Sequence, residues 1–186
     1  MQKGQRKSDE LAHWEGFQKG DKSSFLELYD TNYEVLFVYA QKIAKDKQLA
    51  EDCIHDTFLD LWEKRGKLGH VKNLRAYLFT CTRNIVLQKL KKSKLENTTG
   101  DVGDFLFGLE FSYEDLLIKE QAFEQTKKQL ENAVNELTNR QKEIIFLRFN
   151  NGLSYDEIAE ITSLSIRRVY NVVHEALLVL RKNLKK

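Results

Sequence analysis

The chain has 186 residues, of which 41% are hydrophobic and 31% are charged, and its formal net charge is only +2. This hydrophobic content supports a packed core, and no apolar run is long enough to span a membrane. The polar, basic N-terminus lacks the apolar segment of a signal peptide. Cys53 and Cys81 both lie among apolar residues at helical spacing, which indicates reduced core thiols in a cytoplasmic protein.

Catalytic and metal-binding patterns are missing from the sequence. The four histidines share no spacing typical of metal ligands, and there is no glycine-rich phosphate-binding loop. No nucleophile is paired with a base at a spacing that would suggest catalysis. We therefore expect no metal ion, no cofactor and no small-molecule substrate, and we do not expect an enzyme.

The first half of the chain predicts helices that each bury one apolar face. Residues 24–45 carry apolar side chains at helical spacing, and the polar stretch Asp30–Asn32 predicts a break in this helix. Residues 49–64 repeat apolar residues at intervals of three and four, whereas the opposite face is acidic. Because acidic side chains repel DNA, we expect a protein partner on that face. The two glycines of RGKLGHVKN, residues 65–73, predict a loop.

Charge is segregated along the chain, although its sum is close to zero. Residues 64–94 contain ten basic residues and no acidic one, whereas residues 95–125 contain eight acidic residues and one lysine. Residues 165–186 are basic again, with six basic residues and one acidic residue. Such segregation indicates a polyanionic partner that is contacted at two places.

The first basic segment includes LRAYLFTCTRNIVLQKLKK, residues 74–92, which predicts a helix that is both apolar and cationic. Cations that follow a phosphate backbone, interleaved with aromatic rings on which bases stack, suit single-stranded DNA. A solvated basic face is the alternative, but a face kept only for solubility normally mixes both signs.

An acidic linker follows this helix. Residues 96–115, ENTTGDVGDFLFGLEFSYED, contain three glycines, many acids and no steady period. In the free chain these acids are expected to fold back on the basic surface of residues 64–94 and to screen it. A helix is expected to resume near Tyr113 and to run to about Leu137.

The last third of the chain predicts a helix-turn-helix. Thr138 is a candidate N-cap for a helix that runs through Phe149. Ser154 and Glu157 form a capping box for a short helix that ends near Ile161. A three-residue turn follows, and Ser165 caps the final helix. The apolar side of this helix is expected to face the core and consists of Ile166, Val169, Val173, Ala176, Leu177 and Leu180. A short capped helix, a tight turn and a longer helix that begins with exposed basic residues are typical of a DNA-binding helix-turn-helix.

Together these segments resemble the RNA polymerase sigma-70 family, within its small two-domain extracytoplasmic-function (ECF) group. AEDCIHDTFLDLWEKR is similar to the segment that binds core polymerase, and NLRAYLFTCTRNIVLQKLKK is similar to the −10 recognition and melting segment. LSYDEIAEITSLSIRRVYNVVHEAL resembles the −35-binding helix-turn-helix. Ser163 stands where the family usually has a turn glycine, and Glu175 stands where a basic residue is common.

The resemblance implies an all-α fold with region 2 at residues 14–95, the acidic linker at residues 96–115 and region 4 at residues 116–186. The residues expected to bind core polymerase are Asp52, Asp56, Phe58 and Trp62. The residues expected to bind the −10 element are Arg65, Lys67, Lys72, Arg75, Tyr77, Arg83, Asn84 and Lys89. The residues expected to bind the −35 element are Ser165, Arg167, Arg168, Asn171 and His174.

The resemblance also implies a mechanism. The chain would bind core RNA polymerase, recognise −35 duplex DNA and hold the melted −10 strand, while a membrane-associated anti-sigma factor is a further expected partner. The apolar side of helix 74–92 would pack on helix 49–64 and its cationic side would hold the melted strand. The polymerase and DNA surfaces of region 2 are therefore expected on opposite faces. The alternatives are a helix-turn-helix regulator that acts without polymerase and a decoy that imitates such a factor without transcribing.

Overall fold

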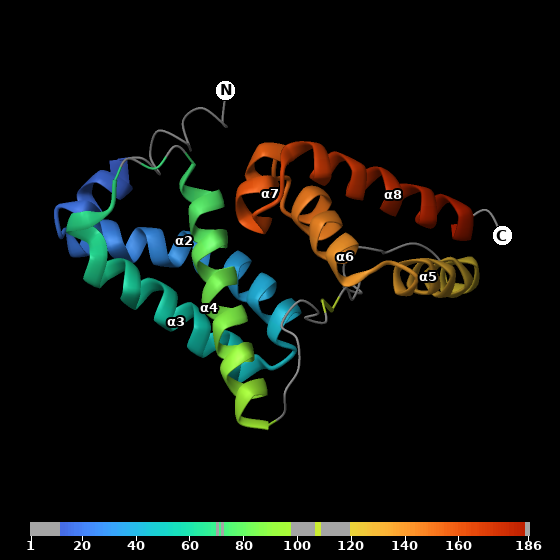
Figure 1. Cartoon of the computed structure of the whole chain (residues 1–186), viewed down its shortest axis with the longest axis horizontal. Helices are drawn as coiled ribbons and strands as arrows, with labels where there is room; N and C mark the ends of the chain where they lie inside the picture. The colour runs from blue at the N-terminus through green and yellow to red at the C-terminus, as the bar shows by residue number, and fades with distance from the viewer. Residues whose placement is uncertain (1–11, 70, 72, 98–106, 109–119, 185–186) are drawn as a thin grey trace. The chain divides into compact units, whose positions relative to one another are not determined.

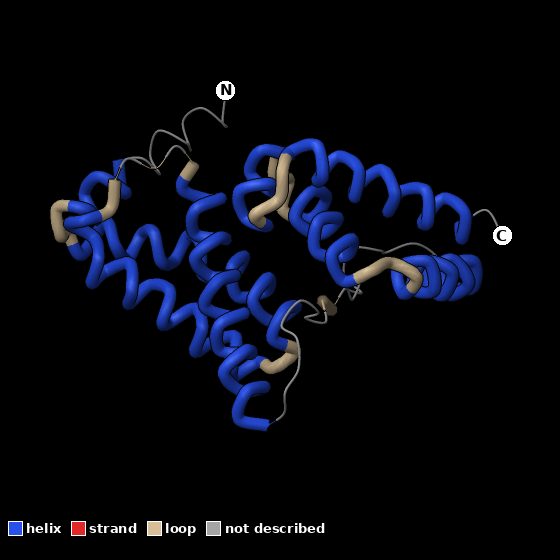
Figure 2. Tube along the Cα trace, viewed as in Figure 1, coloured by secondary structure: helices blue, strands red, loops and turns tan. Residues whose placement is uncertain are grey.

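The computed structural model describes residues 12–69, 71, 73–97, 107–108 and 120–184. The regular elements in these ranges are all helices, so the predicted all-α fold is confirmed for the described part of the chain (Figure 2). Two compact units are present, Met1–Val102 and Gly103–Lys186. Most of the expected linker 96–115 lies outside the described residues, and the expected domain limits stay a prediction.

The first unit is built on three long helices that pack against one another (Figure 1). They are α2 (Lys22–Ala44), α3 (Lys47–Lys64) and α4 (Leu74–Asn97). Their apolar stripes meet in a core whose largest fully buried side chains include Leu36, Tyr39, Ile54, Leu78 and Phe79. Burial of these stripes is the main source of stability for such helices.

Helix α2 is continuous, and the expected break at Asp30–Asn32 is wrong. The side chain of Asn32 is buried, and its Nδ2 donates a hydrogen bond to the carbonyl of Leu28 at 2.9 Å. This bond within the helix satisfies the amide, so the polar residue does not interrupt the apolar stripe. Asp21 caps the start of the helix, and its carboxylate accepts the backbone N–H of Ser24 at 2.9 Å.

The predicted loop at residues 65–73 contains one short 3₁₀ turn, η1 (Arg65–Lys67). A helical segment at residues 12–18 holds the following stretch, because Gln18 Nε2 donates to the carbonyls of Leu68 at 2.6 Å and Gly69 at 3.3 Å. Asn73 then caps α4 by accepting the N–H of Ala76 at 3.0 Å. The loop therefore has fixed ends on both sides.

The second unit packs three shorter helical elements on one long helix (Figure 1). Helices α5 (Glu120–Asn135), α6 (Asn139–Ile145) and α7 (Tyr155–Thr162) all contact α8 (Ile166–Leu184). Helix α6 continues as a π-helical turn, η3 (Phe146–Asn150), and Gly152 follows with φ +65°. The predicted helix from Thr138 through Phe149 therefore ends in a wider turn.

The predicted capping residues are confirmed. The hydroxyl of Thr138 accepts the N–H of Gln141 at 3.2 Å, and Gln141 returns the bond by accepting the N–H of Thr138 at 3.0 Å. Ser154 and Glu157 form the same reciprocal pair at the start of α7. Each pair satisfies two backbone donors that a helix start leaves free, which fixes where both helices begin.

Candidate functional site

The turn between α7 and α8 presents the predicted recognition helix. Ser163 ends α7 in the left-handed region at φ 55°, and the hydroxyl of Ser165 accepts the N–H of Arg168 at 3.2 Å. All five side chains that the sequence assigns to this surface are exposed: Ser165, Arg167, Arg168, Asn171 and His174. A helix with exposed donors in its first turns fits the major groove of DNA.

Two apolar residues on this helix were placed on the wrong side by the periodicity. Ile166 and Leu177 were expected to face the core, but each is 45% exposed, and Tyr170 is 52% exposed. Val172, by contrast, is buried at 3%. Spacing locates an apolar stripe, but it does not show where the neighbouring helices stop covering it.

Helix α4 does not present the expected cationic side. Arg83 is buried, with 7% of its surface exposed, and Arg75 is half-buried with its guanidinium 5.8 Å from the ring centre of Phe79. Among residues 74–93 of this helix, the exposed side chains are two uncharged amides followed by residues of its last described turn. They are Asn84, Gln88, Lys91, Lys92 and Ser93. The outer face of α4 is thus suited first to hydrogen bonding and only at its end to phosphate.

Tyr77 is held against the N-terminal segment rather than displayed as a free platform. Its ring lies 5.8 Å from that of Trp14 in an edge-on arrangement. Burial raises the pKa of Tyr77 to about 12, and neighbouring Cys81 adds to the shift. Only the part of the ring that remains accessible is therefore available for the expected stacking on a base.

Two residues expected to contact DNA instead touch residues expected to contact polymerase. Lys89 Nζ lies 2.6 Å from the carboxylate of Asp56. The guanidinium of Arg65 lies 4.3 Å from the ring centre of Trp62 and donates to the carbonyl of that residue at 2.5 Å. The two predicted sets therefore meet at an edge through these residues and do not lie wholly on opposite faces. Lys67 is exposed, and Lys72 lies outside the described residues.

The Asp56–Lys89 pair affects the ionisation of the lysine. Burial lowers the pKa of Lys89, but the hydrogen bond and charge of Asp56 outweigh it, so the pKa lies above its ordinary value. The lysine is therefore charged at neutral pH, and its charge is directed at α3. On the same helix, Asp52 is exposed and accepts a hydrogen bond from Gln48 at 3.2 Å.

Phe58, expected at the polymerase surface, is 3% exposed and belongs to an aromatic cluster. Its ring lies 4.8 Å from Tyr29 and 6.2 Å from Phe25, and Trp62 lies 5.0 Å from Phe25. Phe58 therefore lies beneath the surface and supports it, rather than being exposed for direct contact with a partner.

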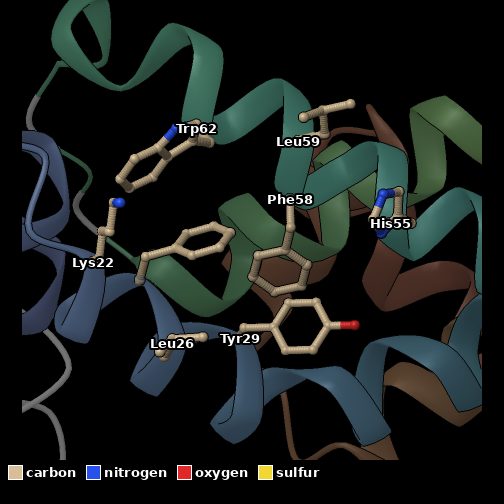
Figure 3. A pocket seen from close by; sticks show the side chains of 8 residues that line it. Lys22, Leu26, Tyr29, His55, Phe58, Leu59 and Trp62 are labelled. Atoms are coloured by element: carbon tan, nitrogen blue, oxygen red, sulfur yellow. The ribbon is translucent and has the colours of Figure 1, made fainter.

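A groove of about 520 Å³ opens over this cluster between α2 and α3 (Figure 3). Its lining is Lys22, Phe25, Leu26, Tyr29, His55, Phe58, Leu59 and Trp62. Leu26 is 57% exposed and Leu59 is 48% exposed, although both are large and apolar. The sequence did not lead us to expect these two leucines at the surface. Leu59 could have been noticed, because it interrupts the acidic face of α3.

Two models of known protein families match the chain, one within each compact unit. Residues 28–96 match the family model described as Sigma-70 region 2, and residues 127–180 match the model described as Sigma-70, region 4. The chain belongs to the sigma-70 family. Its relatives place it in the ECF group, and the first unit carries region 2 while the second carries region 4.

Two relatives illustrate the membership of this chain in the ECF group. The ECF sigma factor BldN of Streptomyces coelicolor is 32% identical over 147 residues, which are 77% of this chain and 54% of BldN. The factor SigL of Mycobacterium tuberculosis is 29% identical over 91 residues, 48% of this chain and 51% of SigL. This sigma-70 chain thus spans about half the length of these relatives.

A similar solved structure is the sigma factor RpoE of Bartonella quintana in complex with the anti-sigma factor NepR. It is 27% identical with a TM-score of 0.62, and the match covers 87% of this chain and 96% of RpoE. In the described residues, no helix of the sigma-70 chain is long and apolar enough to cross a membrane, and no His, Cys, Asp and Glu side chains gather as a metal site.

Proposed function

We propose that this chain is an alternative sigma factor, which binds core RNA polymerase, recognises −35 and −10 promoter elements and helps to melt DNA. The observation that supports this most is the presence, in one chain, of region 2 with an exposed apolar groove and region 4 with an exposed polar recognition helix. A regulator that acts without polymerase needs the recognition helix but does not need an apolar groove for binding polymerase.

The polymerase-binding surface is proposed to be the groove between α2 and α3 together with the acids beside it. Leu26 and Leu59 supply exposed apolar area, and Asp52 supplies a charge at the rim. Interfaces of this kind combine a buried apolar centre with a polar rim. Phe58 and Trp62 support the groove from below, and Trp62 also lines it.

The −10 surface is proposed to run along the outer face of α4 and the loop before it. Asn84 and Gln88 offer amide groups to unpaired bases, and Lys67, Lys91 and Lys92 offer charge to phosphates. Opening the duplex costs stacking and pairing energy, which capture of an unpaired base offsets. The fixed ends of the 65–73 loop favour such capture, because little freedom is lost on binding.

The proposed domain roles are region 2 for polymerase and the −10 element at residues 14–95, the linker at residues 96–115 and region 4 for the −35 element at residues 116–186. The proposed partners act in the cytoplasm, and binding rather than catalysis accounts for the activity. Because RpoE was solved with an anti-sigma factor, we also propose a protein of that kind as a regulator here.

Run-off transcription tests the proposal. Purified core polymerase and the full chain are incubated with a library of promoters whose −35 and −10 positions are randomised. Initiation that depends on the chain, from a defined pair of elements, supports a sigma factor. Tight duplex binding by the chain alone, with no initiation when core polymerase is added, would instead support a regulator that acts without polymerase.

A further inference from the structure

The start of the recognition helix carries two exposed apolar side chains among its polar ones. Ile166 is 45% exposed and Tyr170 is 52% exposed. Arg167 and Asn171, which directly follow them in the sequence, are also exposed. With 3.6 residues per turn, positions four apart lie about 40° from each other around the axis. Ile166 and Tyr170 therefore form one apolar strip along the edge of the polar face.

The ring of Tyr170 is held in place by a stack that crosses from α8 to α7. Its centre lies 4.0 Å from that of Tyr155, and the two planes are inclined by 28°. The guanidinium of Arg148 lies 4.7 Å from the ring centre of Tyr155, and Arg148 Nη1 donates to the carbonyl of Leu153 at 2.8 Å. A ring fixed in this way loses little freedom when it meets a ligand.

We propose that Ile166 and Tyr170 read thymine methyl groups in the −35 element, a specificity that rests on the proposed function. Thymine alone among the four bases presents a methyl group in the major groove, and apolar side chains recognise it by contact. The first turns of a recognition helix are the part that reaches base edges. Arg167 and Asn171, which flank the strip, supply the hydrogen bonds and charge that place the helix in the groove.

A protein partner bound along the exposed side of α8 is the competing explanation. The same side continues to Leu177, which is also 45% exposed but lies eleven residues after Ile166. At 1.5 Å per residue this is about 16 Å further along the axis, beyond the turns that reach bases. A protein partner would use Leu177 as well, whereas thymine reading uses only Ile166 and Tyr170. Leu177→Ala is therefore the matched control.

The experiment uses the full chain with core polymerase on its preferred promoter, as selected from the randomised library. Each thymine of the −35 element is replaced in turn by deoxyuridine, which removes only the methyl group. With the wild-type chain, initiation at limiting holoenzyme should fall roughly threefold to fivefold at one or two positions, the scale of one buried methyl group. Ile166→Ala and Tyr170→Ala should each abolish the difference between thymine and uracil at one position.

Tyr170→Phe keeps the ring and should retain the discrimination, and Leu177→Ala should retain it in full. The inference is overturned if wild-type initiation is indifferent to every replacement, if the selected element contains no thymine, or if the alanine variants still discriminate. These results leave the sigma-factor proposal standing, since initiation still depends on the chain. Absence of any initiation would remove both proposals.

Discussion

The ammonium of Lys89 lies 2.6 Å from the carboxylate of Asp56, so an ion pair joins α4 to α3. One member belongs to the predicted DNA-binding set and the other to the predicted polymerase-binding set. Both side chains are partly exposed, at 32% and 45%, so a pair of this kind adds little stability, about 0.5 kcal/mol. Its larger consequence is that each charge is engaged by the other until a partner competes for it.

Asp56→Asn is expected to strengthen binding of the free chain to single-stranded DNA and to weaken binding to core polymerase. Removal of the carboxylate leaves the charge of Lys89 free to meet a phosphate. Fluorescence anisotropy with a labelled single-stranded −10 oligonucleotide at low salt should show about a threefold rise in affinity. The slope of log affinity against log salt should steepen by about 0.7, as for one added phosphate contact on a single strand.

Asp52→Asn is the matched control for this measurement. Asp52 lies on the same helix and carries the same charge, but it accepts a hydrogen bond from Gln48. It should leave the salt slope unchanged. Equal effects of both substitutions on DNA binding would show that only general charge matters, and that the Asp56–Lys89 contact does not restrain the lysine.

The groove between α2 and α3 predicts that Leu26→Glu and Leu59→Glu reduce affinity for core polymerase at least tenfold. Both side chains are about half exposed, so a charged replacement remains solvated in the free chain. At the interface the same charge would be buried without a partner. Affinity is measured by titrating labelled chain with core polymerase. Leu184 in the other unit is a leucine of similar exposure, at 44%, and the Leu184→Glu variant should bind normally. Loss of affinity in that variant as well would count against the groove.

The burial of Arg83 predicts that its substitution lowers stability, whereas its place in the sequence suggested a role in DNA binding. Because the side chain is buried, Arg83→Ala should lower the free energy of unfolding by about 2 kcal/mol, the scale of truncating a buried side chain. Asn84→Ala, one residue later but exposed, should change stability by less than about 0.5 kcal/mol. Urea unfolding of both variants distinguishes them, and a stable Arg83→Ala variant would contradict this assignment.

These residues show which features the sequence could predict. Helix starts were readable because Thr138, Ser154 and Ser165 act through bonds to residues three positions away, which sequence spacing contains. The apolar stripes were readable for the same reason. The roles of Arg83 and Lys89 were not, since both depend on what the neighbouring helices cover and on a partner in α3 that is distant in sequence. Charge counts identify a basic segment, but they do not show which way its side chains turn.

The thiol of Cys53 predicts a loss of stability at alkaline pH. Burial raises the pKa of Cys53 to about 11, and the charge of nearby Lys89 offsets only part of the shift. Above its ordinary pKa of about 9 the thiol ionises in the unfolded chain but not in the folded one. The contribution of Cys53 is therefore complete below pH 9 and is lost as the pH rises towards 11. At pH 10 the loss should be about 1 kcal/mol.

Urea unfolding at pH 8 and pH 10 measures this effect, with Cys53→Ala as the reference. The alanine variant lacks the titrating group, so its stability should fall less over this interval. Iodoacetamide should label Cys53 far more slowly in the folded chain than in urea at pH 8, tested in a Cys81→Ser background. Rapid labelling of the folded chain would contradict a buried, protonated thiol.

Ser163, in the turn of the helix-turn-helix, has a backbone conformation that is unfavourable for a residue with a side chain. Ser163 adopts φ 55°, where a side chain costs about 1 kcal/mol that glycine avoids. Glycine in turn loses more backbone freedom on folding, about 0.5 kcal/mol. Ser163→Gly should therefore raise the free energy of unfolding of the region 4 unit by about 0.5 kcal/mol. Thermal unfolding measures it, with Ser163→Ala as the control, because alanine keeps the Cβ and should give no gain. A lower stability for the glycine variant would mean that the serine side chain stabilises the turn by more than its strain costs.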